Sequence, residues 1–412
     1  MLICSIDLIG GQAVQLRQGK THVLTSPEDP IELAKRFNRY GEVAVIDLDA
    51  ALRQGDNLEL LRKLCQVADV RVGGGIRSHE RAHELLRAGA RQIIVGTAAT
   101  PEFLEKLPPA RVQVALDSID GQVVDHGWTE TTADSVLERA QRLAPYCSSF
   151  LCTFVKEEGG MGGMPLDKVE ALARSLPHPV TVAGGIATGQ EVAAISRMGH
   201  DVQVGMALYT GALDPVDTVV ESLDFAKANQ LIPTIVQDQA GQVLTLAYSS
   251  PESLRKALQE GKGIYYSRSR QELWEKGATS GHTQKLLSCR TDCDRDALLF
   301  VVEQQGHACH RQSYSCFGSP LPAPRFGLHQ LFETLKQRRT NPPEGSFTAR
   351  LFANRKLLKR KIMEEAFEVA TFADRRELVW EIADAVYFMS ALAVDEGISW
   401  EEIEDELGGR HR

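Results

Sequence analysis

The chain has 412 residues, of which 43% are hydrophobic and 25% are charged, and its formal net charge at pH 7 is -9. This length predicts two to four domains, and the acidic balance disfavours general binding to nucleic acid or to anionic membranes. No apolar run reaches the roughly 18 residues of a membrane span, and the amino terminus lacks the pattern of a signal peptide. The eight cysteines form no compact disulfide pattern, so we expect a cytoplasmic protein.

Residues 1–228 alternate short apolar runs with amphipathic helical stretches. Eight runs are predicted to be strands, at 2–6, 43–48, 70–72, 92–95, 112–116, 149–153, 180–182 and 202–204. Helices are expected between them, for example at 78–88, 135–143 and 166–175. Eight strand–helix units over about 225 residues are typical of an α/β fold, the closed (β/α)8 or TIM barrel, whose catalytic residues follow the carboxyl ends of the strands.

The predicted barrel contains an internal repeat. Asp7 and Asp117 end the first and fifth strands, and two kinds of glycine turn recur at matched positions in the two halves. Glycine lets backbone N–H groups approach a phosphate beside a helix N-terminus, so the repeat predicts a substrate with a phosphate at each end. The candidate clamp residues are Gly74, Gly75, Gly96, Thr97, Gly184, Gly185 and Gly205.

Two aspartates that face each other across one barrel mouth predict an acid and a base. Asp7 taken alone could equally be a structural carboxylate, and the matched position of Asp117 favours catalysis. Trp128 follows a glycine-containing loop after the fifth strand. It either packs in the core or lies across the mouth and stacks on a heteroaromatic substrate.

The second region, residues 229–320, is predicted to be a small α+β domain that binds metal. Strands are expected at 232–237, 243–247 and 264–268, and a helix is expected to begin at Pro251. Three cysteines, Cys293, Cys309 and Cys316, suit zinc, because thiolates select soft or borderline ions and three protein ligands leave one position open for water. Cys289 is interpreted as a packed side chain.

Asp292, Asp294 and Asp296 alternate along the chain, so in an extended segment their carboxylates share one face and offer oxygen ligands to magnesium. His310 could be a fourth zinc ligand, a general base or a solvated side chain. We favour the base, because adjacent residues of an extended segment point apart. A zinc site and a magnesium site so close in sequence indicate hydrolytic chemistry.

Residues 326–412 follow a proline-rich linker at 319–324 and are predicted to be all-helical, with helices at 328–337, 348–373 and 377–395. Two carboxylate pairs lie one turn apart on two of these helices, Glu364 with Glu368, which have Glu365 beside them, and Glu381 with Asp384. Acidic helix faces are usually only solvated. Here the neighbouring residues are apolar, which places the carboxylates between helices and predicts bound magnesium with a phosphate chain.

The barrel motifs Ser5-Ile-Asp7, Val72-Gly-Gly-Gly-Ile-Arg77, Ala115-Leu-Asp117 and Gly127-Trp128 resemble those of phosphoribosylformimino-5-aminoimidazole carboxamide ribotide isomerase. The resemblance implies an Amadori rearrangement with Asp7 as proton acceptor and Asp117 as donor, and it implies substrate contacts from Arg77, Trp128 and Thr153. The sister cyclase barrel fits less well at Gln15–Gly19. Two departures put efficiency or substrate range in doubt, Gln15 in place of a common arginine and the loop 154–161 after the sixth strand.

Residues 231–318 resemble phosphoribosyl-AMP cyclohydrolase through Leu273-Trp274, the aspartate triplet, Cys309-His310 and Cys316. The resemblance implies zinc-dependent opening of the adenine ring, magnesium at the triplet, and zinc ligands drawn from two subunits. The tail resembles phosphoribosyl-ATP pyrophosphohydrolase, a MazG-like all-α fold, through its glutamate pairs. This second resemblance implies release of pyrophosphate.

Together the motifs predict one trifunctional chain for the second, third and fourth steps of histidine biosynthesis. Its expected partners are small phosphoribosyl nucleotides and a second copy, joined through the cyclohydrolase and pyrophosphohydrolase regions. Two alternatives remain open. The barrel could have lost or changed its activity beside two active hydrolases, or it could serve only as a scaffold for them.

Overall fold

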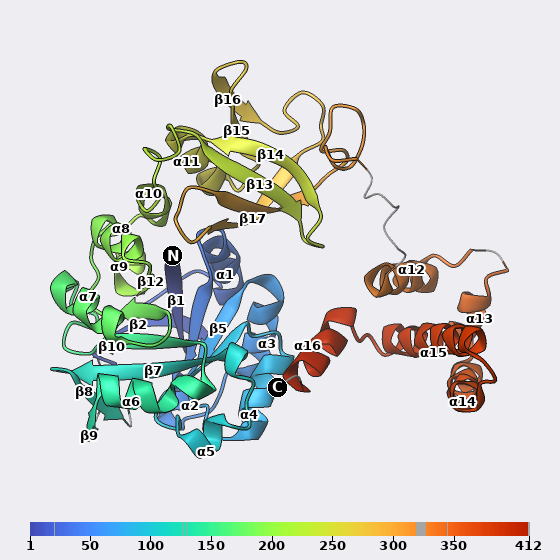
Figure 1. The fold of residues 1–412 in the computed structure, drawn as a ribbon, viewed down its shortest axis with the longest axis horizontal. Helices are drawn as coiled ribbons and strands as arrows, with labels where there is room; N and C mark the ends of the chain where they lie inside the picture. The colour runs from blue at the N-terminus through green and yellow to red at the C-terminus, as the bar shows by residue number, and fades with distance from the viewer. Residues whose placement is uncertain (20, 126, 129, 319–326, 344, 411–412) are drawn as a thin grey trace. The chain divides into compact units, whose positions relative to one another are not determined.

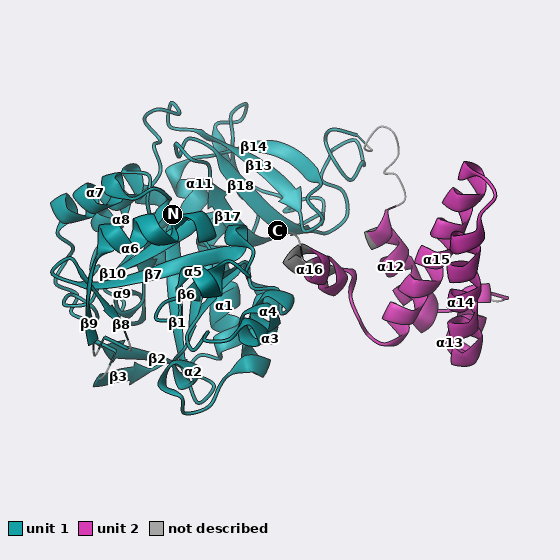
Figure 2. Cartoon of the chain, turned by 60° about the horizontal axis from the view of Figure 1, so that its bottom comes forward, with its two compact units in different colours: residues 1–318, 409–412 teal, residues 319–408 magenta. Residues whose placement is uncertain are grey.

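The computed structural model describes residues 1–412 except 20, 126, 129, 319–326, 344 and 411–412. The chain divides into two compact units, residues 1–318 with 409–412, and residues 319–408 (Figure 2). The predicted proline-rich linker lies outside the described residues. Among the helices of the described part, none is both long enough and apolar enough to cross a membrane.

A closed parallel barrel forms the first part of the larger unit and confirms all eight predicted strands. Neighbouring strands pair in chain order, and β12 pairs with β1 to close the ring (Figure 1). The strands are β1 (Leu2–Ile9), β4 (Val43–Asp47), β5 (Val70–Gly73), β6 (Gln92–Val95), β7 (Val112–Ile119), β10 (Ser149–Phe154), β11 (Val180–Ala183) and β12 (Asp201–Val204).

Helices follow the strands as the sequence predicts. Ser78 and Ser135 each accept a hydrogen bond from a backbone N–H of the first turn, which is why helices begin directly after them. The helices are α1 (Pro30–Asn38), α2 (Leu48–Leu52), α3 (Leu58–Val67), α4 (His79–Arg87), α5 (Pro101–Leu104), α6 (Val136–Leu143), α7 (Leu166–Ser175), α8 (Gly189–Arg197), α9 (Met206–Tyr209) and α10 (Pro215–Glu221).

The internal repeat extends to hairpins that the sequence did not predict. β1 continues past Asp7 and pairs with β2 (Gln12–Arg17), which pairs with β3 (Thr21–Thr25). β7 likewise continues past Asp117 to β8 (Gln122–Asp125) and β9 (Glu130–Ser135). Each aspartate therefore lies within a strand rather than at its end, where the barrel rim opens into a hairpin.

The cyclohydrolase-like region belongs to the same compact unit as the barrel, and one continuous cluster of buried side chains runs through both. Its main sheet has the order β14-β13-β18-β17, and a separate pair is β15–β16. The elements are β13 (Ile232–Asp238), β14 (Val243–Ser249), α11 (Pro251–Glu260), β15 (Ile264–Ser267), β16 (Glu272–Glu275), β17 (Gln284–Thr291) and β18 (Leu298–Gln304).

The smaller unit is helical, as predicted, around a core that includes Phe332, Leu351 and Phe388. The single helix expected at 348–373 is wrong. Asn354 interrupts it with φ -135°, and its side chain accepts a hydrogen bond from the N–H of Leu357 at 3.1 Å to begin a new helix. The helices are α12 (Leu328–Thr340), α13 (Phe347–Ala353), α14 (Arg355–Thr371), α15 (Arg375–Asp395) and α16 (Trp400–Arg410).

Candidate functional site

The barrel mouth contains a cavity of about 320 Å³. The structure brings to this cavity every residue predicted for the barrel site, which comprises the phosphate clamps, the acid–base pair and the implied substrate contacts. These residues are Asp7, Gly74, Gly75, Arg77, Gly96, Thr97, Asp117, Trp128, Thr153, Gly184, Gly185 and Gly205. At two of these positions a side chain would also clash with the neighbouring backbone. A Cβ on Gly74 or on Gly184 would lie 2.2 or 2.6 Å from the backbone oxygen of Asp47 or Phe154.

The two catalytic candidates have different surroundings. Asp7 accepts a hydrogen bond from the Ser5 hydroxyl at 3.2 Å, and burial raises its pKa to about 6. Asp117 accepts hydrogen bonds from the Trp128 indole at 2.8 Å and from Thr153. Burial raises the pKa of Asp117, whereas these two hydrogen bonds lower it by favouring the charged form. The two carboxyls thus differ in hydrogen bonding, because Asp117 has two side-chain donors and Asp7 has one.

Trp128 lines the cavity and is not a core residue. Its backbone is left-handed, with φ 67°, and a Cβ on Gly19 would meet the indole ring at 2.9 Å. The ring thus covers Gly19, between β2 and β3, while its N–H reaches Asp117. Of the two predicted roles, the structure supports the one at the mouth.

Glu158 is a third carboxylate of this cavity and was not among the predicted site residues. Burial, together with the negative charges of Asp7 and Asp117, raises its pKa to about 7. It belongs to the loop 154–161, which was interpreted only as a departure from the isomerase pattern. A backbone hydrogen bond holds this loop, because the Gln18 N–H donates to the backbone oxygen of Glu158 at 3.3 Å. Its place after the carboxyl end of a barrel strand was the available signal.

Two of the three predicted zinc ligands meet within one chain. The thiols of Cys309 and Cys316 share a hydrogen bond, and a hydrogen bond from the Arg311 backbone lowers the pKa of Cys309. Cys293 is exposed, and no metal-sized group of three ligands among the described residues includes a cysteine. His310 is exposed beside Cys309. One copy therefore brings together only two of the three predicted thiol ligands.

The aspartate triplet forms a compact group of oxygens, and one carboxylate oxygen from each of Asp292, Asp294 and Asp296 lies within 4.8 Å of the others. The predicted extended segment is wrong, because these residues make the turn between β17 and β18, with Arg295 in a left-handed conformation at φ 63°. The turn is what brings the carboxylates together. Three oxygens so placed fit a hard divalent ion.

In the helical unit, Glu365, Glu368 and Glu381 form a second such group, also within 4.8 Å. Glu365 is only 3% exposed, and burial and the neighbouring carboxylates raise the pKa of Glu381, with Asp384 among them. Glu364 lies outside the group. It is exposed and pairs with Lys361 at 2.7 Å, so Glu365, not Glu364, shares the inner helix face with Glu368.

Three family models match the chain. Residues 1–214 match the model described as "Histidine biosynthesis protein", 245–318 match "Phosphoribosyl-AMP cyclohydrolase", and 328–411 match "Phosphoribosyl-ATP pyrophosphohydrolase". The chain belongs to the histidine biosynthesis protein family. This histidine biosynthesis protein thus combines isomerase, cyclohydrolase and pyrophosphohydrolase domains in the predicted order. Enzymes of the last two families generally depend on metal ions.

Several similar proteins are also named as histidine biosynthesis proteins. The chain is 34% identical over 370 residues to the "Histidine biosynthesis bifunctional protein his7" of Schizosaccharomyces pombe, covering 87% of this chain and 84% of that protein. It is 39% identical over 207 residues to the "Histidine biosynthesis bifunctional protein HisIE" of Pyrococcus furiosus, covering 48% of this chain and 99% of that protein. It is 33% identical over 338 residues to the "Histidine biosynthesis trifunctional protein" of Neurospora crassa, but covers only 35% of it.

Proposed function

We propose that this histidine biosynthesis protein releases pyrophosphate from phosphoribosyl-ATP in its helical unit, opens the adenine ring of the product in its cyclohydrolase domain, and isomerises the resulting aminoaldose in its barrel. The principal observation is that each domain contains its own matching set of reactive side chains. The reactive side chains of the barrel support the proposal most strongly, because Asp7 and Asp117 share one cavity with both duplicated glycine turns.

In the barrel, Asp7 is the proton acceptor and Asp117 the proton donor. With a pKa of about 6, Asp7 is ionised at neutral pH and can take the proton from C2 of the opened sugar, the carbon adjacent to the one that bears the amine. Asp117 donates to the ring oxygen as the ribose opens, and Trp128 and Thr153 hold its carboxylate in place. Glu158, with a pKa of about 7, keeps a second protonated carboxyl in the cavity near neutral pH.

In the cyclohydrolase domain, Cys309 and Cys316 would hold zinc together with Cys293 of a second copy, and the aspartate triplet would hold magnesium. The paired thiols and the clustered oxygens have the donor types that these ions prefer. Bound zinc supplies an activated water for attack on the adenine ring. His310 lies beside Cys309 and is exposed, so it is available to take a proton from that water.

In the helical unit, Glu365, Glu368 and Glu381 would hold magnesium, and Asp384 lies beside them. A divalent ion offsets the repulsion among these carboxylates and neutralises charge on the phosphate chain of the substrate. The Lys361 ammonium, 2.8 Å from Glu365, orients that carboxylate.

A second copy covers the exposed apolar face of α14 and α15. Several large apolar side chains of these two helices are exposed, with 68% of Phe367 and 68% of Trp380 accessible. The other members are Met363, Val379 and Ile382. Exposed apolar faces of this kind mark interaction sites. Dimerisation here, and through the shared zinc site, gives the homodimer.

One observation favours a second candidate function. The his7 protein is named bifunctional, yet the 370 aligned residues are too many for the two hydrolase domains alone and must include much of the barrel. A bifunctional hydrolase with a barrel of absent or altered activity is therefore the alternative. The changed loop 154–161 is compatible with it.

Supplying phosphoribosyl-ATP to the purified protein and to blocked variants separates these readings. Glu365→Gln should accumulate phosphoribosyl-ATP, Cys309→Ala phosphoribosyl-AMP, and Asp117→Asn the unrearranged aminoaldose. Glu364→Gln, outside the carboxylate group, is the matched control and should release pyrophosphate at close to the wild-type rate. A wild-type protein that stalls at the aminoaldose would eliminate the isomerase and leave the bifunctional alternative.

A further inference from the structure

Lys227 lies on the segment that joins α10 of the barrel to β13 of the cyclohydrolase domain. Its ammonium contacts the carboxylates of both Asp294 and Asp296. Its own backbone is held in place, because the Lys227 N–H donates to Asp224 Oδ1 at 2.9 Å. A lysine from the barrel side thus reaches two of the three carboxylates proposed to bind magnesium.

The turn that carries Asp292, Asp294 and Asp296, called here the acidic turn, is also held by backbone and side-chain contacts other than the Lys227 ammonium. The Asp224 N–H donates to the backbone oxygen of Arg295 at 3.1 Å, and Arg295 itself is 8% exposed. On the preceding strand, Arg290 pairs with Asp69 and donates to Asn38 Oδ1 at 3.1 Å. The lysine and the carboxylates therefore face each other from backbones that are each tied to the barrel.

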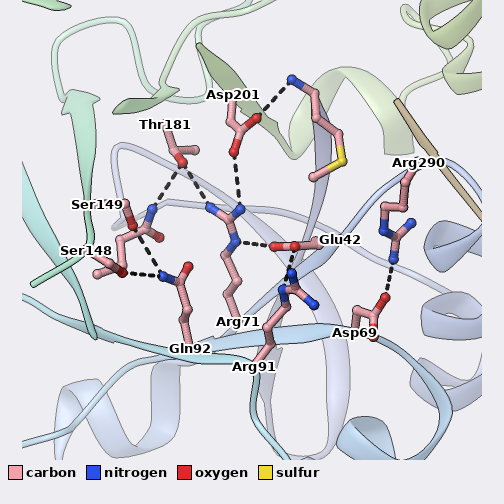
Figure 3. A network of polar contacts seen from close by, with 12 residues as sticks. Glu42, Asp69, Arg71, Arg91, Gln92, Ser148, Ser149, Thr181, Asp201 and Arg290 are labelled. Carbon is pink, nitrogen blue, oxygen red and sulfur yellow. Dashed lines mark hydrogen bonds and ion pairs between the residues drawn. The ribbon is translucent and has the colours of Figure 1, made fainter. Parts of the chain in front are cut away.

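Apart from the Arg290–Asp69 pair, Figure 3 shows a separate polar network of the barrel, centred on Arg71. Arg71 contacts Glu42 at 2.5 Å, Thr181 at 3.0 Å and Asp201 at 3.2 Å. Asp201 also binds the terminal amino group of Met1 at 2.9 Å. The network joins β5, β11 and β12 to the amino terminus.

We propose that Lys227 is a built-in counter-ion of the acidic turn, which a divalent ion must displace from Asp294 and Asp296. This inference rests on the proposed magnesium site. An ammonium and a divalent ion compete for the same carboxylate oxygens, and the lysine side chain, 47% exposed, has room to withdraw into solvent. The barrel thereby sets the divalent affinity of the cyclohydrolase domain, with Lys227 as a positioning residue.

The test is equilibrium binding of Mn²⁺ to the full zinc-loaded chain, followed by the electron paramagnetic resonance of free Mn²⁺. The class of Mn²⁺ sites that is lost or weakened in Asp294→Asn is the one that belongs to the acidic turn. Lys227→Met should bind Mn²⁺ at that class roughly threefold to tenfold more tightly, as expected for removal of two exposed ion pairs. Lys227→Arg, which keeps the charge, should bind within about twofold of the wild type.

Lys262 provides a matched control, because its ammonium bridges Glu260 and Glu275 at 3.1 and 3.2 Å and is also 47% exposed. Lys262→Met should leave Mn²⁺ binding unchanged. Unchanged or weaker binding in Lys227→Met would overturn the inference while the magnesium site stands. If Asp294→Asn removes no class of sites, the magnesium assignment itself fails, and the inference fails with it.

Discussion

The indole N–H of Trp128 lies 2.8 Å from Oδ2 of Asp117, so a side chain from the rim hairpin is fastened to a catalytic candidate inside the barrel. The bond closes the mouth over Gly19 on the opposite hairpin. It also favours the charged form of Asp117, which must release and regain a proton in each turnover.

Replacing this tryptophan by phenylalanine keeps an aromatic ring but removes the donor. Trp128→Phe should raise the pKa of Asp117, because a hydrogen bond to its charged form is lost. The alkaline limb of the pH profile for isomerisation should move to higher pH, and kcat/KM should fall about tenfold. The acid limb, set by Asp7 near pH 6, should stay in place. A uniform loss of rate without a shifted limb would contradict this role.

Glu158 should make the larger unit less stable as pH rises. Its pKa is about 7 in the folded protein, against an ordinary value of 4.5, so between these values the folded state holds a proton that the unfolded state has lost. The proton on Glu158 therefore contributes to the stability of the folded state. This contribution is complete below pH 4.5 and is lost as pH rises through 7. Glu158→Gln cannot ionise and should raise the free energy of unfolding at pH 8 by about 1–3 kcal/mol.

Urea unfolding at pH 5 and at pH 8 tests the effect of Glu158→Gln, because the gap between variant and wild type should widen with pH. Glu157→Gln, next along the chain but absent from the cavity wall, is the control and should follow the wild type at both pH values. If the free energies of unfolding of Glu158→Gln and the wild type differ by the same amount at both pH values, ionisation of Glu158 does not destabilise the folded state.

A zinc site shared between copies predicts complementation. Cys293→Ser and Cys309→Ser proteins should each lack cyclohydrolase activity. After unfolding and refolding together, half of the dimers contain one chain of each kind, and each such dimer has one intact site. The mixture should regain about a quarter of wild-type activity and of bound zinc. A mixture of Cys309→Ser with Cys316→Ser should regain none, because these ligands come from the same copy. Recovery in that second mixture would contradict the arrangement.

The apolar face of α14 and α15 should govern dimer strength. Trp380→Glu places a charge in a surface proposed to be dry, and it should raise the dimer dissociation constant about tenfold or more. Sedimentation velocity over a dilution series measures this change. Val23→Glu, at an exposed apolar position of the barrel, should have no such effect. Equal dissociation constants for Trp380→Glu and the wild type would exclude this face as the interface.

By itself, the sequence determined the architecture and most of the chemistry. Strand and helix periodicity is local, so all eight barrel strands and the helix starts at Ser78 and Ser135 could be predicted. The duplicated glycine turns identified the cavity, because their spacing relates two halves of one barrel.

Only the tertiary structure decided which carboxylates and thiols meet. Glu158 lies near Asp7 and Asp117 because its loop folds over the barrel mouth. Of the predicted Glu364, Glu365 and Glu368, only the last two group with Glu381. Cys293 stays apart from Cys309 and Cys316 in one copy. Such convergence depends on turns, helix rotation and contacts between distant residues, none of which leaves a periodic signal in the sequence.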